Sequence, residues 1–125
     1  MLLNCLCVAL GGGLGAVLRY LISLIPLPGP FPLLTLLTNF AGAVVIGVIA
    51  GLSEGARVSP RGLLLWKTGL CGGFTTFSTF SLETVTLLEE GRGVLGAAYA
   101  GASVAFCLAG VVLGRLCVRL LWPES

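Results

Sequence analysis

The sequence has no histidine and few charged side chains, and both shortages narrow its possible classes. Charged residues make up only 10% of the 125 positions, against about a quarter in an average soluble domain. A water-soluble globule could not cover its surface with so few charges, so we exclude this class. Without histidine, the zinc sites that mix cysteine and histidine cannot be built.

Further absences exclude two kinds of function. The seven basic residues are scattered and form no basic run, which argues against nucleic-acid binding. The apolar runs contain no pair of carboxylates, and the chain shows no nucleophile with a base and no phosphate-binding loop, so we expect no enzyme. The five cysteines lie inside apolar runs, as is typical of reduced packing residues.

Apolar residues dominate the chain instead. They form 57% of it, and the mean hydropathy is +1.08. A membrane helix needs about 20 apolar residues in succession, and four runs reach this length, at about residues 2–25, 33–52, 63–88 and 94–121. The sequence therefore predicts an all-α integral membrane protein, with residues 1–125 as a single four-helix transmembrane domain in the lipid bilayer of the cell (plasma or inner) membrane.

Basic residues near helix ends favour one orientation of such a protein. With four crossings, the N-terminus, the second loop and the C-terminus share one side of the membrane. That side holds most of the basic residues, namely Arg57, Arg61, Lys67, Arg115 and Arg119. This bias predicts that both termini are cytoplasmic.

The third apolar run differs from the others because glycines and hydroxyls crowd its middle, from Cys71 to Ser81. The pair Gly72–Gly73 weakens a helix at mid-membrane depth. Each backbone group left unpaired there would cost several kcal/mol, because hydrocarbon offers it no hydrogen-bond partner. Freed carbonyls can instead coordinate a cation. The run predicts a helix that is broken in the middle of the membrane. The alternative is a continuous helix with a flexible kink.

Two phenylalanines follow the glycine pair on one helical face. Phe77 and Phe80 are three residues apart, and the positive edge of an aromatic ring attracts anions. From spacing alone, the rings also suit a purely packing role. The hydroxyls between them, including that of Thr79, favour the functional interpretation, because such groups are costly to bury without a purpose.

Polar groups in the second and fourth runs are the other candidates. Asn39 is the one amide of the second run, able either to bond a neighbouring helix or to donate its NH₂ to an anion. Tyr99, Ser103 and Cys107 recur every four residues and make one weakly polar stripe along the fourth. Packing and functional roles both remain open for this stripe.

Two charged residues lie near membrane depth. Arg19 follows 18 uncharged residues, and Glu83 comes three residues after Phe80. A charged residue inside a membrane usually has a function, but a long charged side chain near a helix end can instead reach the membrane interface. Because both are near the ends of predicted helices, we expect them in a vestibule or as anchors.

The third run resembles the core of the Fluc (CrcB) family of fluoride channels. The resemblance rests on the stretch Gly72-Gly73-Phe74-Thr75-Thr76-Phe77-Ser78-Thr79-Phe80-Ser81, followed by Glu83. Supporting matches are the glycine-rich first run ending in Arg19, the stretch from Thr38 to Gly42, and the pair Tyr99 and Ser103. The resemblance covers essentially the whole chain.

The resemblance implies a dual-topology antiparallel dimer with two pores, which exports fluoride passively from the cytoplasm. It implies pore-lining roles for Asn39, Phe77, Phe80, Thr79, Tyr99 and Ser103. It also implies a central structural Na⁺ held by the main-chain carbonyls of Gly72 and Thr75. No lysine is expected to trap the ion. Because the charge bias is large for a chain that inserts both ways, a homodimer and a heterodimer with a paralogue both remain open.

Two other functions compete with the channel. A small multidrug-type exporter is also a four-helix, dual-topology protein, but it needs a membrane carboxylate, and the first two predicted helices have no Asp or Glu. A non-transporting membrane scaffold would use the packing glycines alone. In a scaffold, Asn39 would be interchangeable with leucine.

Overall fold

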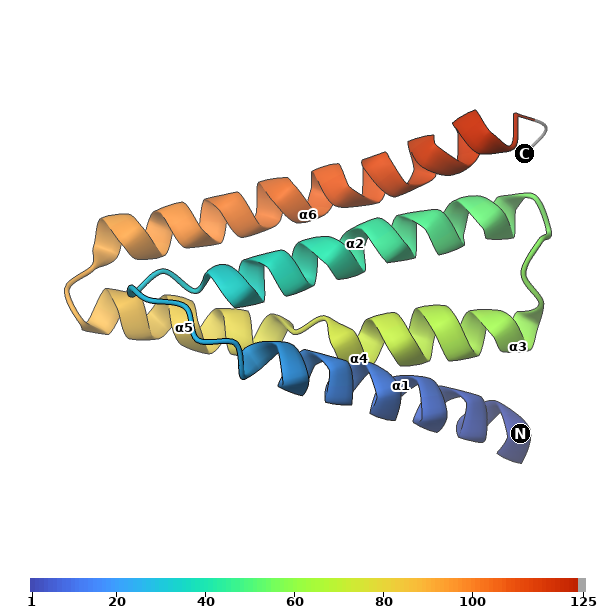
Figure 1. Cartoon of the computed structure of the whole chain (residues 1–125), viewed down its shortest axis with the longest axis horizontal. Coiled ribbons are helices and arrows are strands. Elements are labelled where there is room, and N and C mark those ends of the chain that lie inside the picture. Colours follow the sequence, from blue (N-terminus) through green and yellow to red (C-terminus); the bar gives the residue numbers. More distant parts are fainter. Residues whose placement is uncertain (124–125) are drawn as a thin grey trace.

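The structure is a computed structural model that describes residues 1–123, and its secondary structure is helical. Figure 1 shows the helices running side by side. In chain order they are α1 (Leu2–Ser23), α2 (Leu33–Glu54), α3 (Pro60–Leu63), η1 (Leu64–Cys71), α4 (Gly72–Phe74), α5 (Phe77–Glu89) and α6 (Gly93–Leu121). The expected all-α fold is confirmed.

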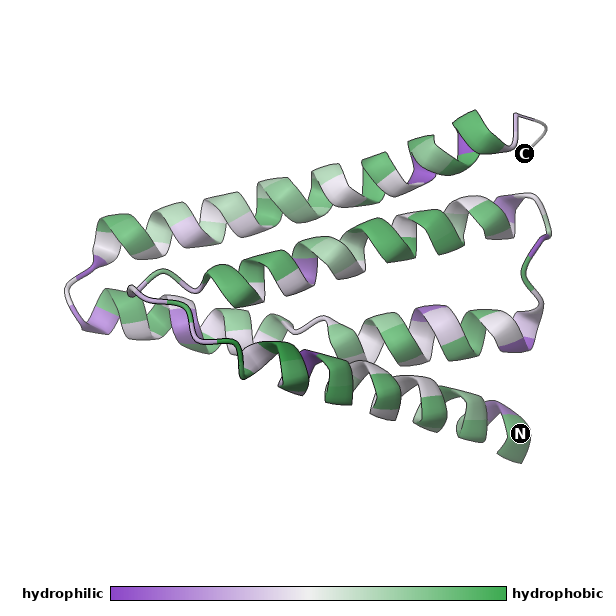
Figure 2. Ribbon diagram, in the orientation of Figure 1, coloured by the Kyte–Doolittle hydropathy of each residue, from purple (hydrophilic) through white to green (hydrophobic). Residues whose placement is uncertain are grey.

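Three of these helices are long and apolar enough to cross a membrane as single rods. They are α1, α2 and α6. The other crossing is assembled from α3, η1, α4 and α5, which follow one another along residues 60–89. In the view of Figure 2 apolar residues cover most of the ribbon, and hydrophilic residues are present at the helix ends and links and at a few positions within the helices. This distribution fits a protein whose surroundings are lipid.

The predicted break in the third apolar run is confirmed. Thr75 (φ −83°, ψ 155°) and Thr76 (φ −147°, ψ 116°) are extended between α4 and α5. Before the break, η1 is a π-helix of eight residues, a rare and strained form of helix in which each N–H reaches back five residues. This crossing is therefore irregular along much of its length, unlike the other three.

Local sequence explains where several helices begin. The proline-rich link ends at Pro32, directly before α2, and Pro60 opens α3. Proline fits a first helical turn because the backbone N–H that it lacks would have no partner there. The Ser59 hydroxyl accepts the N–H of Gly62 at 3.0 Å, and so caps α3.

The chain ends and the links are divided between the two ends of the helix bundle. The N-terminus, the α2–α3 link and the C-terminus lie at one end, and the α1–α2 and α5–α6 links lie at the other (Figure 1). The charges follow the same division. Arg115 pairs with Glu54 at 3.1 Å at the first end, whereas Arg92 and Glu90 approach to 3.8 Å at the second.

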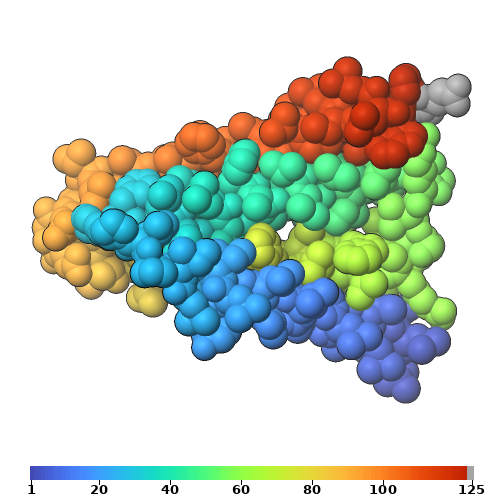
Figure 3. All heavy atoms as spheres, in the orientation of Figure 1, coloured from blue at the N-terminus to red at the C-terminus, as the bar shows by residue number. Residues whose placement is uncertain are grey.

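Glycines bring the helices into backbone contact in two pairs. A Cβ at Gly11 of α1 would collide with the carbonyl oxygen of Leu65 in η1, and a Cβ at Gly47 of α2 would collide with that of Val111 in α6. Small residues allow this close approach between membrane helices. As a result α1 packs on η1 and α4 rather than on α2, and Figure 3 shows α1 diverging from α2 toward the N-terminus.

Candidate functional site

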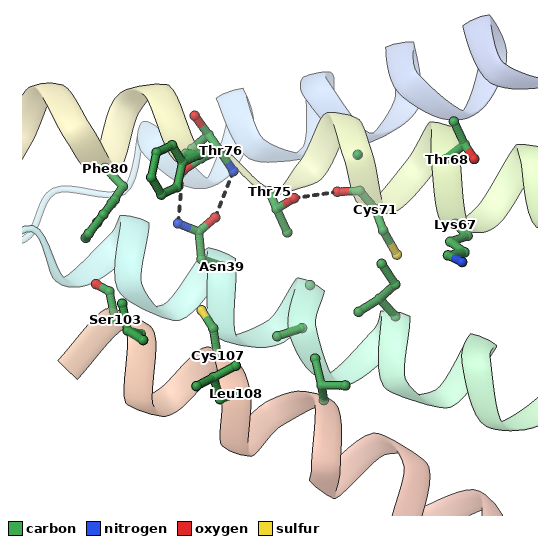
Figure 4. A pocket seen from close by; sticks show the side chains of 17 residues that line it. Asn39, Lys67, Thr68, Cys71, Thr75, Thr76, Phe80, Ser103, Cys107 and Leu108 are labelled. Atoms are coloured by element: carbon green, nitrogen blue, oxygen red, sulfur yellow. Dashed lines mark hydrogen bonds between the residues drawn. The ribbon is translucent and has the colours of Figure 1, made fainter. Parts of the chain in front are cut away.

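Asn39 of α2 occupies the break in the third crossing. Its Nδ2 donates to the carbonyl oxygen of Thr76 at 3.1 Å, and its Oδ1 accepts the N–H of Thr76 at 2.8 Å (Figure 4). The amide thus pairs both main-chain groups of Thr76, as a neighbouring peptide would. One Nδ2 hydrogen remains for another acceptor.

Side chains of the broken segment satisfy further main-chain groups. The Thr76 hydroxyl accepts the N–H of Thr79 at 3.1 Å, which caps α5. The Thr75 hydroxyl donates to the carbonyl of Cys71 at 2.8 Å. Leaving these main-chain groups unpaired in hydrocarbon would cost free energy. The side chains of the segment therefore stabilise the break.

Two carbonyls at the break lose their helical donors. In a continuous helix, the N–H of Thr76 would serve Gly72, and that of Thr79 would serve Thr75. Here these N–H groups bind Asn39 and the Thr76 hydroxyl instead. The carbonyl oxygens of Gly72 and Thr75 therefore lack their usual helical donors.

Arg19 of α1 also lies at the break. Its Nε donates to the carbonyl oxygen of Gly73 at 3.2 Å. The sequence places this residue near the end of α1, and the structure shows that its guanidinium reaches into the third crossing. Arg19 thus supplies a donor where α4 ends.

A cavity of about 550 Å³ lies beside the break, between α2, α6 and the third crossing. Six of the sequence candidates line it, namely Asn39, Gly72, Thr75, Phe77, Phe80 and Ser103. Cys107 and Lys67 also contribute to its wall (Figure 4). The cavity thus collects residues from three predicted helices into one place.

Ser103 has an unsatisfied hydroxyl in this cavity. The residue is only 5% exposed, and its Oγ has no hydrogen-bond partner among the residues that the structure describes. An orphaned buried hydroxyl costs about 1–3 kcal/mol. Because Ser103 belongs to the cavity wall, this unpaired hydroxyl is a candidate donor for a ligand.

The aromatic candidates take different positions. The ring centroid of Phe80 lies 5.3 Å from that of Tyr99, which is completely buried, and 5.6 Å from that of Phe77. Phe77 itself is 79% exposed. Phe80 is therefore held against α6, whereas Phe77 projects away from the chain.

A carboxylate lies beside this aromatic group. Glu83 Oε1 accepts the hydroxyl of Thr35 at 2.8 Å, and Oε2 accepts that of Tyr99 at 3.0 Å. Glu83 thus ties α5 to both α2 and α6. In the sequence, Thr35 is notable only because it lies four residues before Asn39. That Glu83 would bind both Thr35 and Tyr99 was not predicted.

Two further residues differ from their sequence-based placement. Thr79 is not part of the cavity wall, and its N–H donates to the Thr76 hydroxyl that caps α5. Lys67 counted only toward the charge bias in the sequence, but here it lines the cavity. No local sequence pattern indicates this, because η1 determines which way Lys67 points.

The sequence of this chain is similar to those of known proteins. A family profile described as "CrcB-like protein, Camphor Resistance (CrcB)" matches residues 6–115. A "Fluoride-specific ion channel FluC" of Ruminiclostridium cellulolyticum is 41% identical over 124 residues, which cover 96% of this chain and 95% of the relative. Proteins described in the same words from Cereibacter sphaeroides (45% identical, covering 95% and 97%) and Rhizobium etli (46% identical, covering 91% and 94%) are also similar. The chain therefore belongs to the CrcB family, the family of the FluC fluoride-specific ion channels.

Proposed function

We propose that this multi-pass membrane protein is a fluoride-specific channel that lets the ion leave the cytoplasm passively. The observation that carries the proposal is the buried Ser103 hydroxyl, which has no partner in a cavity that it shares with Asn39 and Phe80. Fluoride is small and strongly hydrated, so a pore must replace its water with hydrogen-bond donors. The names of the relatives supply the identity of the ion.

The cavity offers donors of moderate strength. They are the second Nδ2 hydrogen of Asn39, the Ser103 hydroxyl, and the ring edges of Phe77 and Phe80. Rapid conduction requires binding that is strong enough for entry and weak enough for release. Neutral donors meet this requirement better than a cation in direct contact with the ion.

The proposed path of the ion extends beyond these residues along α5 and α6. Tyr99 and Thr79 complete it in our proposal, although the Tyr99 hydroxyl donates to Glu83 in this conformation. Cys107 follows Ser103 in the cavity wall, and its thiol is a weaker donor than a hydroxyl. Arg19 and Glu83 keep the vestibule role that the sequence predicts for them in our proposal, although in this conformation Arg19 binds Gly73 and Glu83 binds Thr35 and Tyr99.

A second copy of the chain completes the pores. The exposed Phe77 ring and the open cavity both need a covering surface, and one chain is too thin to enclose two ion paths. The proposed assembly is an antiparallel dual-topology dimer, whether of identical chains or with a paralogue. Light scattering of the purified protein in detergent should give the mass of a dimer, whereas a stable monomer that conducts fluoride would contradict this.

The same break fits a structural Na⁺ at the dimer centre. The carbonyl oxygens of Gly72 and Thr75, which lose their helical donors, would hold it. When bound, the cation would neutralise these oxygens and offset the charge of nearby anions. Exhaustive dialysis into a large organic cation should therefore abolish flux, and return of Na⁺ should restore it. Flux that persists without Na⁺ would contradict the metal site.

Fluoride efflux from liposomes tests the channel itself. Vesicles containing the purified protein and potassium fluoride should release fluoride, recorded with an electrode, once a potassium ionophore relieves the membrane voltage. Chloride should be retained under the same conditions. Electrically silent fluoride efflux without ionophore would indicate a coupled carrier, and release of neither ion would reject the proposal.

A further inference from the structure

We propose that Lys67 recruits fluoride electrostatically into the conduction path of this channel. The inference depends on the proposed function, since it names the residue that brings the anion to the same cavity. Lys67 belongs to η1 of the broken crossing, about two turns before the break at Thr75 and Thr76. It would act at a distance and would not bind the ion at the narrow part of the path.

The π-helix directs Lys67 toward the cavity. The N–H of Gly72 reaches the carbonyl of Lys67, five residues earlier. In an ordinary α-helix, residues five apart differ by about 140° around the axis, whereas the wider π-helix brings them close to one face. Lys67 thus shares the face of Gly72, and both line the cavity.

The cavity has a cationic end and a neutral polar end. Lys67 and Thr68 lie at one end, and Ser103 and Phe80 lie at the other, with Asn39 between them (Figure 4). Lys67 is the one charged residue among those that line the cavity in the described chain. An anion entering past Lys67 would therefore meet a positive charge first and the free Ser103 hydroxyl later.

The charge of Lys67 is not neutralised by the carboxylates that the structure describes. Glu54 pairs with Arg115, and Glu83 accepts the hydroxyls of Thr35 and Tyr99. Glu89 and Glu90 lie at the opposite end of the third crossing, beside the α5–α6 link. Neither of the ion pairs among the described residues includes Lys67, so its positive charge remains to act on the path.

A fixed charge of this kind acts mainly on the rate of ion entry. A cleft lined by one sign of charge raises the local concentration of counter-ions by about 10- to 1,000-fold in favourable cases. A single exposed lysine lies at the low end of that range. The effect fades with salt, because the Debye length falls from about 30 Å at 0.01 M to about 3 Å at 1 M.

Fluoride efflux of the full-length protein tests the inference through its salt dependence. At about 0.01 M total salt, Lys67→Met should lower the initial rate roughly two- to tenfold. In about 1 M of an impermeant salt on both sides, the variant and the unmodified protein should give equal rates. Lys67→Arg, which keeps the charge, should match the unmodified protein at both concentrations.

Arg61→Gln provides the matched control, because Arg61 is a basic residue of the same crossing that does not line the cavity. It should lower the rate at low salt much less than Lys67→Met does, because Arg61 lies outside the cavity wall. Equal rates for Lys67→Met and the unmodified protein at low salt would overturn the inference, and so would a loss that is the same at both salt concentrations. If the unmodified protein conducts no fluoride at all, the proposed function fails instead.

Discussion

Replacing Asn39 by leucine is expected to abolish fluoride efflux and to destabilise the protein. Leucine has the same branching at Cγ, but it leaves both main-chain groups of Thr76 without the partners that Asn39 supplies at 3.1 and 2.8 Å. Each unsatisfied buried group costs about 1–3 kcal/mol, and the pore also loses an amide donor. Efflux from liposomes and thermal unfolding in detergent measure the two effects.

Asn4→Leu is the matched control, because Asn4 lies at the exposed end of α1, where its Oδ1 accepts a hydrogen bond from Arg61 Nε at 3.4 Å. It should change neither the efflux nor the stability. Asn39→Asp keeps an oxygen for the Thr76 N–H but loses the donor, so we expect it to be folded and non-conducting. An Asn39→Leu protein that conducts normally would show that Asn39 only packs, as a scaffold would require.

The number of crossings and the existence of a break were predictable from the sequence. Both depend on local properties: the length of apolar runs, and glycine and hydroxyl residues that weaken a helix at mid-membrane depth. The exact position of the break was harder to predict from the sequence. Gly72 is still helical (φ −62°, ψ −38°), and the chain becomes extended only at Thr75 and Thr76. Asn39 on α2 selects this position, and that contact joins residues 37 apart in the chain.

The orientation of the side chains was also beyond a local reading. The π-helix turns Lys67 into the cavity, and α1 packs so closely on η1 that a Cβ at Gly11 would meet its main chain. The contact of Glu83 with Thr35 and Tyr99 likewise joins three helices. Periodicity assigns a face to each residue of one helix, but it does not show which faces of different helices meet.

Replacing Phe80 by isoleucine is expected to lower fluoride efflux by at least about tenfold. The ring of Phe80 lines the cavity and lies 5.3 Å from that of Tyr99, and isoleucine has no electropositive ring edge for an anion. Loss of one such interaction, worth about 1.4 kcal/mol, corresponds to about a tenfold change. Initial rates of efflux per unit of protein, with the dimer mass checked in detergent, measure the effect.

Phe106→Ile separates the pore role of Phe80 from general packing. Phe106 forms an edge-to-face pair with Phe40, at 6.0 Å between ring centroids, and does not line the cavity. Its replacement should leave efflux nearly unchanged. An equal loss in both variants would mean that efflux responds to any lost aromatic ring, and normal efflux from Phe80→Ile would exclude Phe80 as a pore residue. Phe80→Tyr keeps the ring and should retain more efflux than Phe80→Ile, because the electropositive edge that the anion meets is still present.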